Sequence, residues 1–208
     1  VANAMQDRVP LIFITGCVDH AEAERYTHQV FSHGNMLSEI TKASFTATPS
    51  TCGLIARKAV QIAMEPQQGP VHIDLPVTVA EALADEAFVP PSDISGTLYP
   101  NDQQIAHIAP FIQNAKNPLA IAGVDAVNEN AGSEISQFCR KFNIPLIGTY
   151  KAKGLLDESD PLSLGGAGLS PKADRLLMPH VEASDCILLL GYDPIEMRIG
   201  WRDPWDTS

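Results

Sequence analysis

A cluster of glycines is the strongest candidate for cofactor chemistry in this sequence. The segment SLGGAGLS carries Gly165, Gly166 and Gly168 after a probable strand. Backbone N–H groups in such a loop can approach a phosphate or a flat cofactor, because no side chain stands in the way. A glycine cluster is equally typical of a flexible connection. The sequence therefore predicts a loop here and leaves its role open.

The common motifs of catalysis are absent from the sequence. It contains no GxGxxG, GxxxxGK[ST], HExxH or GxSxG pattern, which argues against a plain Rossmann-type oxidoreductase and against the usual phosphate, zinc and nucleophile sites. Its four cysteines lie far apart, without the pair spacing of a zinc site. We expect reduced, mostly buried thiols and no metal site.

Short apolar runs alternate with helical patterns, and these elements must position any site. None of the runs alternates cleanly with polar residues, which indicates strands covered on both faces. The runs are PLIFI (10–14), VHIDL (71–75), LAIAG (119–123), PLIGT (145–149) and CILLLG (186–191). The helical patterns cover 52–65, 102–115 and 130–142, the second with Asn101 and Gln104 as a capping pair. The fold class predicted is α/β, with parallel sheets and helices on both faces.

A stretch rich in proline, serine and aspartate divides the chain. Residues 88–102 show no hydrophobic periodicity, as expected of a linker. We predict a first unit over residues 1–90, a linker over 91–100 and a second unit over 101–208. Strands this apolar need neighbours on both edges, so we expect the chain to be an excerpt of a longer protein.

The charge of the chain excludes several kinds of partner. The formal net charge is −11 and the isoelectric point about 4.8, so nucleic acid and anionic lipid surfaces would repel it. No apolar run approaches the roughly 20 residues of a membrane helix, and no signal peptide is recognisable. We expect a cytoplasmic protein that binds neither nucleic acid nor membrane and acts on a small molecule.

Several fragments, taken in order, resemble one enzyme family. The segments ITG (14–16), ITKAS (40–44) and GPVHIDLPVTV (69–79) are similar to the later half of the pyrimidine-binding domain of thiamine diphosphate-dependent enzymes. The relatives meant are acetolactate synthase, benzaldehyde lyase and sulfoacetaldehyde acetyltransferase. The second unit resembles their Rossmann-like central domain through NPLAIAG, IPLIGTYKAKGLLDESDPLSLGGAG and ASDCILLLGYDPIEMR.

The resemblance implies a cofactor and a reaction for the full-length parent. Such enzymes use thiamine diphosphate with Mg²⁺, act on 2-keto acids or on C–C bonds next to a carbonyl, and form homodimers or homotetramers. In the family the catalytic glutamate would precede Val1 and the GDG...N motif would follow Ser208, so the chain itself is expected to be inactive. The alternative is a non-catalytic module that binds FAD or ADP or serves oligomerisation.

The resemblance also places candidate residues in the first unit. Gln29 matches a glutamine that faces the substrate in the family, and His28 replaces the usual phenylalanine beside it. The amide could hydrogen-bond a substrate oxygen, and the imidazole could relay a proton or simply pack. We interpret His72 and Asp74 as structural residues that cap loops at the strand end.

In the second unit the resemblance points to nucleotide contacts. Gly123, Gly165 to Gly168 and Arg198 fall where some relatives bind FAD or ADP. The flavin binders' FDDR reads IEMR here, and their GGG turn reads GVD, which brings the charge of Asp125 toward a pyrophosphate. We therefore favour no bound flavin, and expect Arg198 to form either such a contact or an exposed ion pair with a nearby carboxylate.

Two positions depart from the acetolactate synthase pattern. Val77 stands where those enzymes carry a lysine, and Cys17 where they often carry a glutamine. Losing the lysine weakens attraction for a small anionic keto acid. The substrate therefore stays open.

Overall fold

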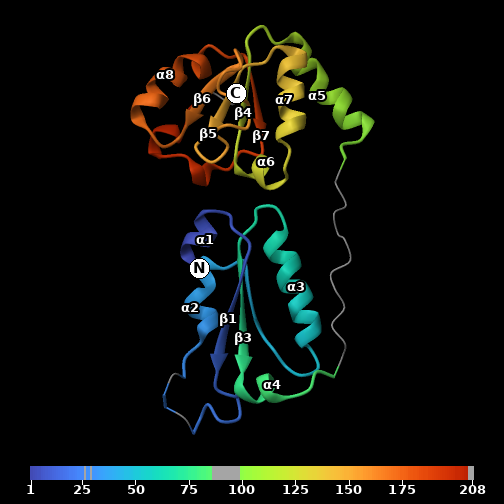
Figure 1. The fold of residues 1–208 in the computed structure, drawn as a ribbon, viewed down its shortest axis with the longest axis vertical. Coiled ribbons are helices and arrows are strands. Elements are labelled where there is room, and N and C mark those ends of the chain that lie inside the picture. Colours follow the sequence, from blue (N-terminus) through green and yellow to red (C-terminus); the bar gives the residue numbers. More distant parts are fainter. Residues whose placement is uncertain (26, 29, 86–98, 206–208) are drawn as a thin grey trace. The chain divides into compact units, whose positions relative to one another are not determined.

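The chain forms two compact units, Val1–Thr97 and Leu98–Ser208 (Figure 1). This is a computed structural model, and it describes residues 1–25, 27, 28, 30–85 and 99–205. Each unit contains its own parallel sheet with helices packed on it. The α/β class with parallel sheets is confirmed. The predicted linker, 91–100, lies almost wholly outside the described residues.

The first unit is built on a three-stranded sheet. Its elements are α1 (Ala2–Gln6), β1 (Leu11–Cys17), α2 (His33–Leu37), the 3-10 helix η1 (Ser38–Ile40), β2 (Ala43–Thr46), α3 (Cys52–Met64), β3 (Pro70–Pro76) and α4 (Val77–Glu81). The strand order is β1-β3-β2, and both pairings are parallel. The register sets Thr15 beside Asp74 and Ser44 beside His72.

The two faces of this sheet differ in chemistry. Val71 and Ile73 of β3 point to the face covered by α3, where they pack against Ala59 and Ala63 in an apolar core. Side chains alternate along a strand, so His72 and the residues two positions away point to the opposite face. Helices α1 and α2 lie on that side (Figure 1). One face of the sheet is therefore apolar and the other carries polar groups.

The second unit is built on a four-stranded sheet. Its elements are α5 (Asp102–Asn114), β4 (Pro118–Ala122), α6 (Val124–Asn128), α7 (Gly132–Phe142), β5 (Leu146–Thr149), β6 (Ser163–Ala167), α8 (Pro171–Glu182), β7 (Cys186–Leu190) and the 3-10 helices η2 (Pro194–Glu196) and η3 (Ile199–Trp201). The order is β6-β5-β4-β7, all parallel. The chain moves outward from β4 to β6 and then returns to β7 on the other side of β4, so the winding direction reverses beside β4.

An apolar core lies on each face of this second sheet. Ala120 and Ala122 of β4 face Ile135 and Cys139 of α7, whereas other β4 side chains face α8. Ile121 is completely buried, which stabilises the fold by about 1.5–3 kcal/mol for a side chain of this size. Helices α7 and α8 therefore hold the sheet between them (Figure 1).

The five apolar runs all form strands, and the three helical patterns form α3, α5 and α7. The capping box of α5 is present, with Asn101 Oδ1 accepting from the backbone N–H of Gln104 at 2.9 Å. Sequence patterns missed β2 and β6. The segment ASFT of β2 is short and half polar, and β6 was predicted as a glycine loop.

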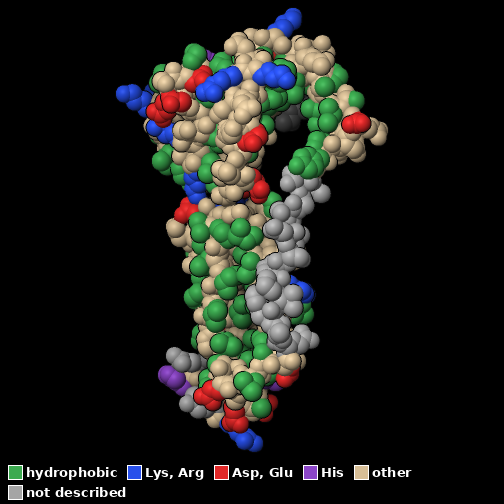
Figure 2. Space-filling view, turned by 45° about the vertical axis from the view of Figure 1, so that its right-hand side comes forward, with side chains coloured by type: hydrophobic (Ala, Val, Ile, Leu, Met, Phe, Trp, Pro, Cys, Tyr) green, Lys and Arg blue, Asp and Glu red, His purple; other side chains and the backbone are tan. Residues whose placement is uncertain are grey.

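The surface of the first unit exposes several large hydrophobic side chains. Ile14 of β1 and Met64 of α3 are more than half exposed. Figure 2 shows hydrophobic side chains spread along the face of this unit that is in view, with charged side chains gathered at its lower end. Among the described residues, no helix is both long and apolar enough to cross a membrane.

Candidate functional sites in the two units

Of the two residues expected to face a substrate, the structure describes only His28. His28 is exposed and lies in the segment before α2. Gln29 lies outside the described residues. Their roles therefore stay predictions.

A buried polar cluster lies on β3, at the face of the first sheet opposite α3. His72 and Asp74 are two positions apart and point the same way, and neighbouring strands add Thr15 and Ser44 at the same level. Thr15 Oγ1 donates to Asp74 Oδ1 at 2.7 Å and lies 2.7 Å from His72 Nε2. Ser44 Oγ lies 2.7 Å from His72 Nδ1. Both ring nitrogens of His72 thus have hydroxyl partners.

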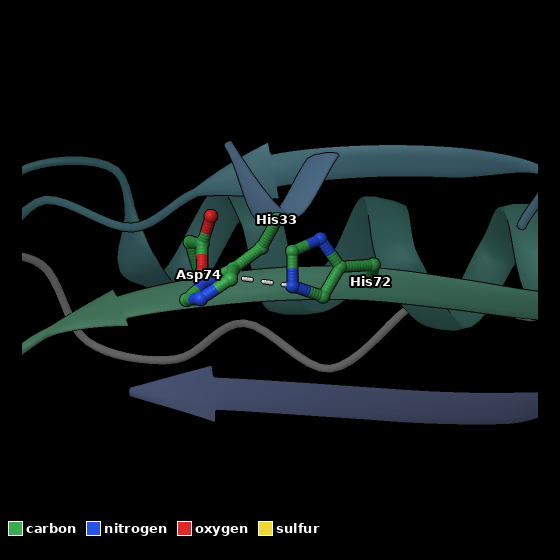
Figure 3. A group of neighbouring side chains, drawn as sticks. All are labelled: His33, His72 and Asp74. Carbon is green, nitrogen blue, oxygen red and sulfur yellow. Dashed lines mark hydrogen bonds and ion pairs between the residues drawn. The ribbon is translucent and has the colours of Figure 1, made fainter. Parts of the chain in front are cut away.

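A second histidine joins the cluster from α2. The N-cap of this helix is Ser32, whose Oγ accepts from the backbone N–H of Asn35 at 3.2 Å, so the helix starts at His33. His33 Nδ1 donates to Asp74 Oδ1 at 2.6 Å, and the ring packs edge-on against Phe31. Figure 3 shows His33 reaching the two β3 side chains. The short helix therefore delivers an imidazole to the polar face of the sheet.

Burial sets the protonation of this cluster. The side chain of His72 is fully buried, and this desolvation lowers its pKa, so the ring is neutral at neutral pH. Burial also raises the pKa of the Cys17 thiol at the end of β1, and the charge of Asp74 adds to the effect. The cluster therefore presents one carboxylate, neutral imidazole nitrogen and hydroxyl groups.

Sequence reasoning found two members of this cluster and missed how they assemble. The hydrogen bonds of His72 and Asp74 agree with a structural role, but their partners are side chains on neighbouring elements, not loop ends. His33 was not among the predicted members, and it is buried. The usable signal was the H-x-D spacing, which places both side chains on one face of a strand.

In the second unit, the predicted glycine loop is instead largely an edge strand. Gly165 and Gly166 belong to β6 and pair with Ile147 and Gly148. The register shifts by one residue at Leu164, and Gly165 has φ +97°. Such a bulge needs a positive φ that only glycine adopts freely. The backbone groups of this segment are thus engaged in a sheet, and the prediction of an open loop was wrong.

Gly123 ends β4 at a point where the backbone of another segment comes very close. A Cβ atom on Gly123 would lie 2.5 Å from the carbonyl oxygen of Gly191 and 2.7 Å from the Cα atom of Tyr192. The absence of a side chain therefore lets the loop after β7 close over β4. The glycine is explained by packing alone.

The Glu196 carboxylate lies at the carboxyl ends of β4 and β5. Glu196 Oε2 accepts from the backbone N–H of Val124 at 2.8 Å, and Oε1 accepts from Thr149 Oγ1 at 2.6 Å. Burial raises the pKa of Glu196, while these hydrogen bonds act in the opposite direction. In open α/β sheets, ligands bind where the winding direction reverses. Here the reversal lies between β4 and β7, and Glu196 takes one donor that borders it, the Val124 N–H just after β4.

Arg198 is held by a carboxylate of α8. Its Nε donates to Asp174 Oδ2 at 2.6 Å, and Asp174 Oδ1 accepts from the backbone N–H of Gly168 at 2.9 Å. The Arg198 backbone N–H donates to the carbonyl of Gly168 at 3.1 Å. The structure thus joins Gly168 and Arg198. The Asp174 side chain is 5% exposed, so the pair is not the exposed contact that the sequence suggested.

These residues do not form a nucleotide cradle. Gly165 and Gly166 pair with β5 in the sheet, and Gly123 allows the backbone of residues 191 and 192 to approach closely. Arg198 is paired with Asp174. A pyrophosphate near Gly123 would also meet the Glu196 carboxylate, and like charges repel. These contacts weigh against FAD or ADP beside Gly123.

Comparison with known proteins agrees with this architecture. Residues 105–207 match the family model "Thiamine pyrophosphate enzyme, central domain". The chain is 33% identical over 175 residues to an acetolactate synthase of Arthrospira platensis, covering 81% of this chain and 30% of the relative. It is 27% identical to oxalyl-CoA decarboxylase of Escherichia coli (strain K12), over 80% of this chain and 31% of that protein. A 2-hydroxyacyl-CoA lyase of Saccharomyces cerevisiae is 26% identical over 100% of this chain and 36% of its own length.

The fold and these matches define a class: a parallel α/β protein whose second unit is the central domain of a cofactor-dependent enzyme. The chain belongs to the thiamine pyrophosphate-dependent enzyme family. It spans about a third of the length of the relatives that it matches.

Proposed function

We propose that this chain is the late part of the pyrimidine-binding domain and most of the central domain of a thiamine pyrophosphate-dependent enzyme. The whole protein then makes or breaks a C–C bond next to a carbonyl group, with 2-keto acids as the first substrate class to test. The observation that carries the proposal is the match of residues 105–207 to the central-domain model. The names of the relatives, a synthase, a decarboxylase and a lyase, agree with chemistry of this kind.

The cofactor's site is not supplied by this sequence alone. Thiamine pyrophosphate contributes a nucleophilic carbon and an electron sink when it is bound. The sequence contains no GDG motif, so the residues present do not fit a diphosphate and Mg²⁺ cradle. We propose that the chain by itself is inactive and that the cofactor binds only in the whole protein.

Within that protein, the proposed contribution of this chain is to orient the substrate. Gln29 would donate a hydrogen bond from its amide to a substrate oxygen. His28 is exposed and is therefore free to face a ligand beside it. Val77, the first residue of α4, is 58% exposed and uncharged, which favours a substrate without the anionic group that a lysine there would attract.

The test uses the full-length gene product. We expect calorimetry to detect thiamine pyrophosphate binding in the presence of Mg²⁺, and turnover of at least one 2-keto acid or acyloin. Gln29→Ala should lower kcat/KM by about 10-fold or more, as expected for a lost hydrogen bond to the reacting group, whereas His107→Gln should leave it unchanged. Absence of cofactor binding by the folded protein would overturn the proposal.

A second function, a non-catalytic nucleotide-binding module, has one observation in its favour. A hollow of about 310 Å³ beside Arg198 is also lined by Arg175 and Trp201. The indole N–H of Trp201 is buried and has no hydrogen-bond partner among the described residues. The pairing of Arg198 with Asp174 weighs against this function. Titration of the protein with FAD and with ADP discriminates the two: micromolar binding that Arg175→Ala abolishes would favour the module.

The cytoplasmic location and the homodimer or homotetramer stay predictions for the whole protein. Sedimentation of the full-length product checks the oligomeric state.

A further inference from the structure

Three metal-ligating groups converge on the polar face of the first sheet. The ring nitrogens His33 Nδ1 and His72 Nε2 and the carboxylate oxygen Asp74 Oδ1 all lie within 4.8 Å of one another (Figure 3). Two histidines and one carboxylate are a frequent ligand set for divalent transition metals. We propose that this cluster is a binding site for one such ion, with Zn²⁺ as the ion that fits best. The site is independent of the proposed enzymatic function.

The spacing of the donor atoms is close to that of a tetrahedral zinc site. Ligands at about 2.0–2.2 Å from the metal lie roughly 3.3 Å from one another. In this cluster Asp74 Oδ1 is 2.6 Å from His33 Nδ1 and 3.6 Å from His72 Nε2. Thr15 Oγ1 supplies a fourth position, since it lies 2.7 Å from Asp74 Oδ1, 2.7 Å from His72 Nε2 and 3.3 Å from His33 Nδ1. The three donor atoms lie within 4.8 Å of one another, so shifts of about 1 Å would convert the hydrogen-bonded cluster into a coordination sphere.

An outer partner needed to orient one ligand is already in place. A metal-binding histidine usually donates its other ring N–H to a neighbouring oxygen. Ser44 Oγ lies 2.7 Å from His72 Nδ1, and a hydroxyl can either donate or accept. The metal-free ring donates from Nε2 to Thr15. Moving that proton to Nδ1 frees Nε2 for the metal and leaves Ser44 as acceptor, without net loss of a proton from His72. His33 undergoes the same change of tautomer: the proton that Nδ1 donates to Asp74 in the metal-free cluster moves to Nε2, which frees Nδ1 for the metal.

The charges of the site favour a cation. Asp74 supplies a carboxylate oxygen beside two imidazole nitrogens. The side chains of His33 and Asp74 are 10% and 15% exposed, so an ion reaches the cluster from their side. A hard cation such as Mg²⁺ prefers oxygen ligands and is expected to bind poorly.

The experiment is a metal titration of the 208-residue chain after treatment with a chelator. We expect one Co²⁺ or Zn²⁺ per chain with micromolar or tighter affinity, and visible absorption of bound Co²⁺ typical of a tetrahedral site. His33→Gln and Asp74→Asn should each weaken binding at least 100-fold. Ser44→Ala should weaken it by about 10–100-fold, as for other outer-shell partners. His107→Gln, which changes an exposed histidine of α5, is the matched control.

A second measurement keeps the proposal testable if those variants do not fold. In the unaltered chain, Zn²⁺ should shift the ring nitrogen resonances of two of the six histidines, those of His33 and His72. Binding that moves the resonances of exposed histidines instead, binding that the folded variants do not weaken, or absence of binding would each show that the cluster is a hydrogen-bonded network only.

Discussion

The histidine at the centre of the first sheet makes this unit sensitive to acid. Burial lowers the pKa of His72 below its ordinary value, so His72 is protonated at a lower pH in the folded unit than in the unfolded chain. A lowered pKa contributes stability that is present above the unfolded value, about 6.5, and lost as pH falls through the folded value. Acid therefore destabilises the unit through this residue.

We predict that the free energy of unfolding of the first unit falls by up to about 1.4 kcal/mol per pH unit just below pH 6.5 from this group alone. His72→Gln should be less stable at pH 8 but should lose that part of the slope. Urea unfolding at a series of pH values measures both effects. His107→Gln should keep the full slope. An unchanged slope in His72→Gln would contradict the assignment of this pH dependence to His72.

The close approach at Gly123 gives a second prediction at this scale. Gly123→Ala places a Cβ atom 2.5 Å from the carbonyl oxygen of Gly191, and overpacking against backbone costs about 1–3 kcal/mol or more. Thermal unfolding should show the second unit destabilised. Gly132→Ala is the control, since its Cβ would meet Leu155 at an ordinary 3.6 Å; this change should leave stability unchanged or slightly raised. Equal stability of the two variants would refute the packing explanation.

At the scale of the elements, the Asp174–Arg198 ion pair stabilises the connection from β6 to α8. Asp174 of α8 holds both the backbone of Gly168 and the guanidinium of Arg198. Removing one partner of a buried pair leaves an uncompensated charge, at a cost of about 3–5 kcal/mol. The Arg198 side chain is 35% exposed, so solvent reduces that cost.

We therefore predict that Arg198→Ala destabilises the second unit by about 1–3 kcal/mol. Arg202→Ala removes an exposed arginine four residues later and should change stability by less than about 0.5 kcal/mol. Chemical denaturation of the two variants provides the comparison. If the two variants have the same free energy of unfolding, the Arg198–Asp174 pair does not stabilise the position of α8. Arg198 is then again a candidate ligand contact.

Strands with continuous apolar runs were predictable from sequence, and strands that depend on their neighbours were not. The apolar run CILLL predicts β7, and helical periodicity predicts α7. The segment SLGGA forms β6 because its backbone completes the ladder of β5 and its bulge accommodates Gly165. Glycine is disfavoured in strands by intrinsic propensity, so local patterns pointed to a loop where tertiary pairing decided otherwise.

The candidate sites were predictable only in part for the same reason. The H-x-D spacing of β3 fixes a shared face, but the arrival of His33 from α2 depends on how a five-residue helix packs on the sheet. Likewise Glu196 comes from a 3-10 helix and reaches across to Val124 and Thr149. Such contacts join residues far apart in sequence, and no short motif encodes them.

On the scale of the molecule, each unit has its own core, and this predicts separable unfolding. The apolar cluster of the first unit contains no residue of the second unit, and the two clusters of the second unit contain none of the first. We expect calorimetry to resolve two transitions, and Gly123→Ala to lower one of them only. Acidification to pH 5.5 should lower the unfolding temperature of the other transition, that of the first unit. A single transition that responds to both changes would show that the units unfold as one.

The outermost strand of the first sheet has a practical consequence for anyone preparing the isolated chain. β1 pairs with β3 along one side only among the described residues, and its Ile14 is 57% exposed. A seven-residue strand with a free backbone edge and an apolar side chain is a template for intermolecular pairing. In concentrated solutions the 208-residue chain should therefore self-associate through this edge. Ile14→Lys should prevent this self-association.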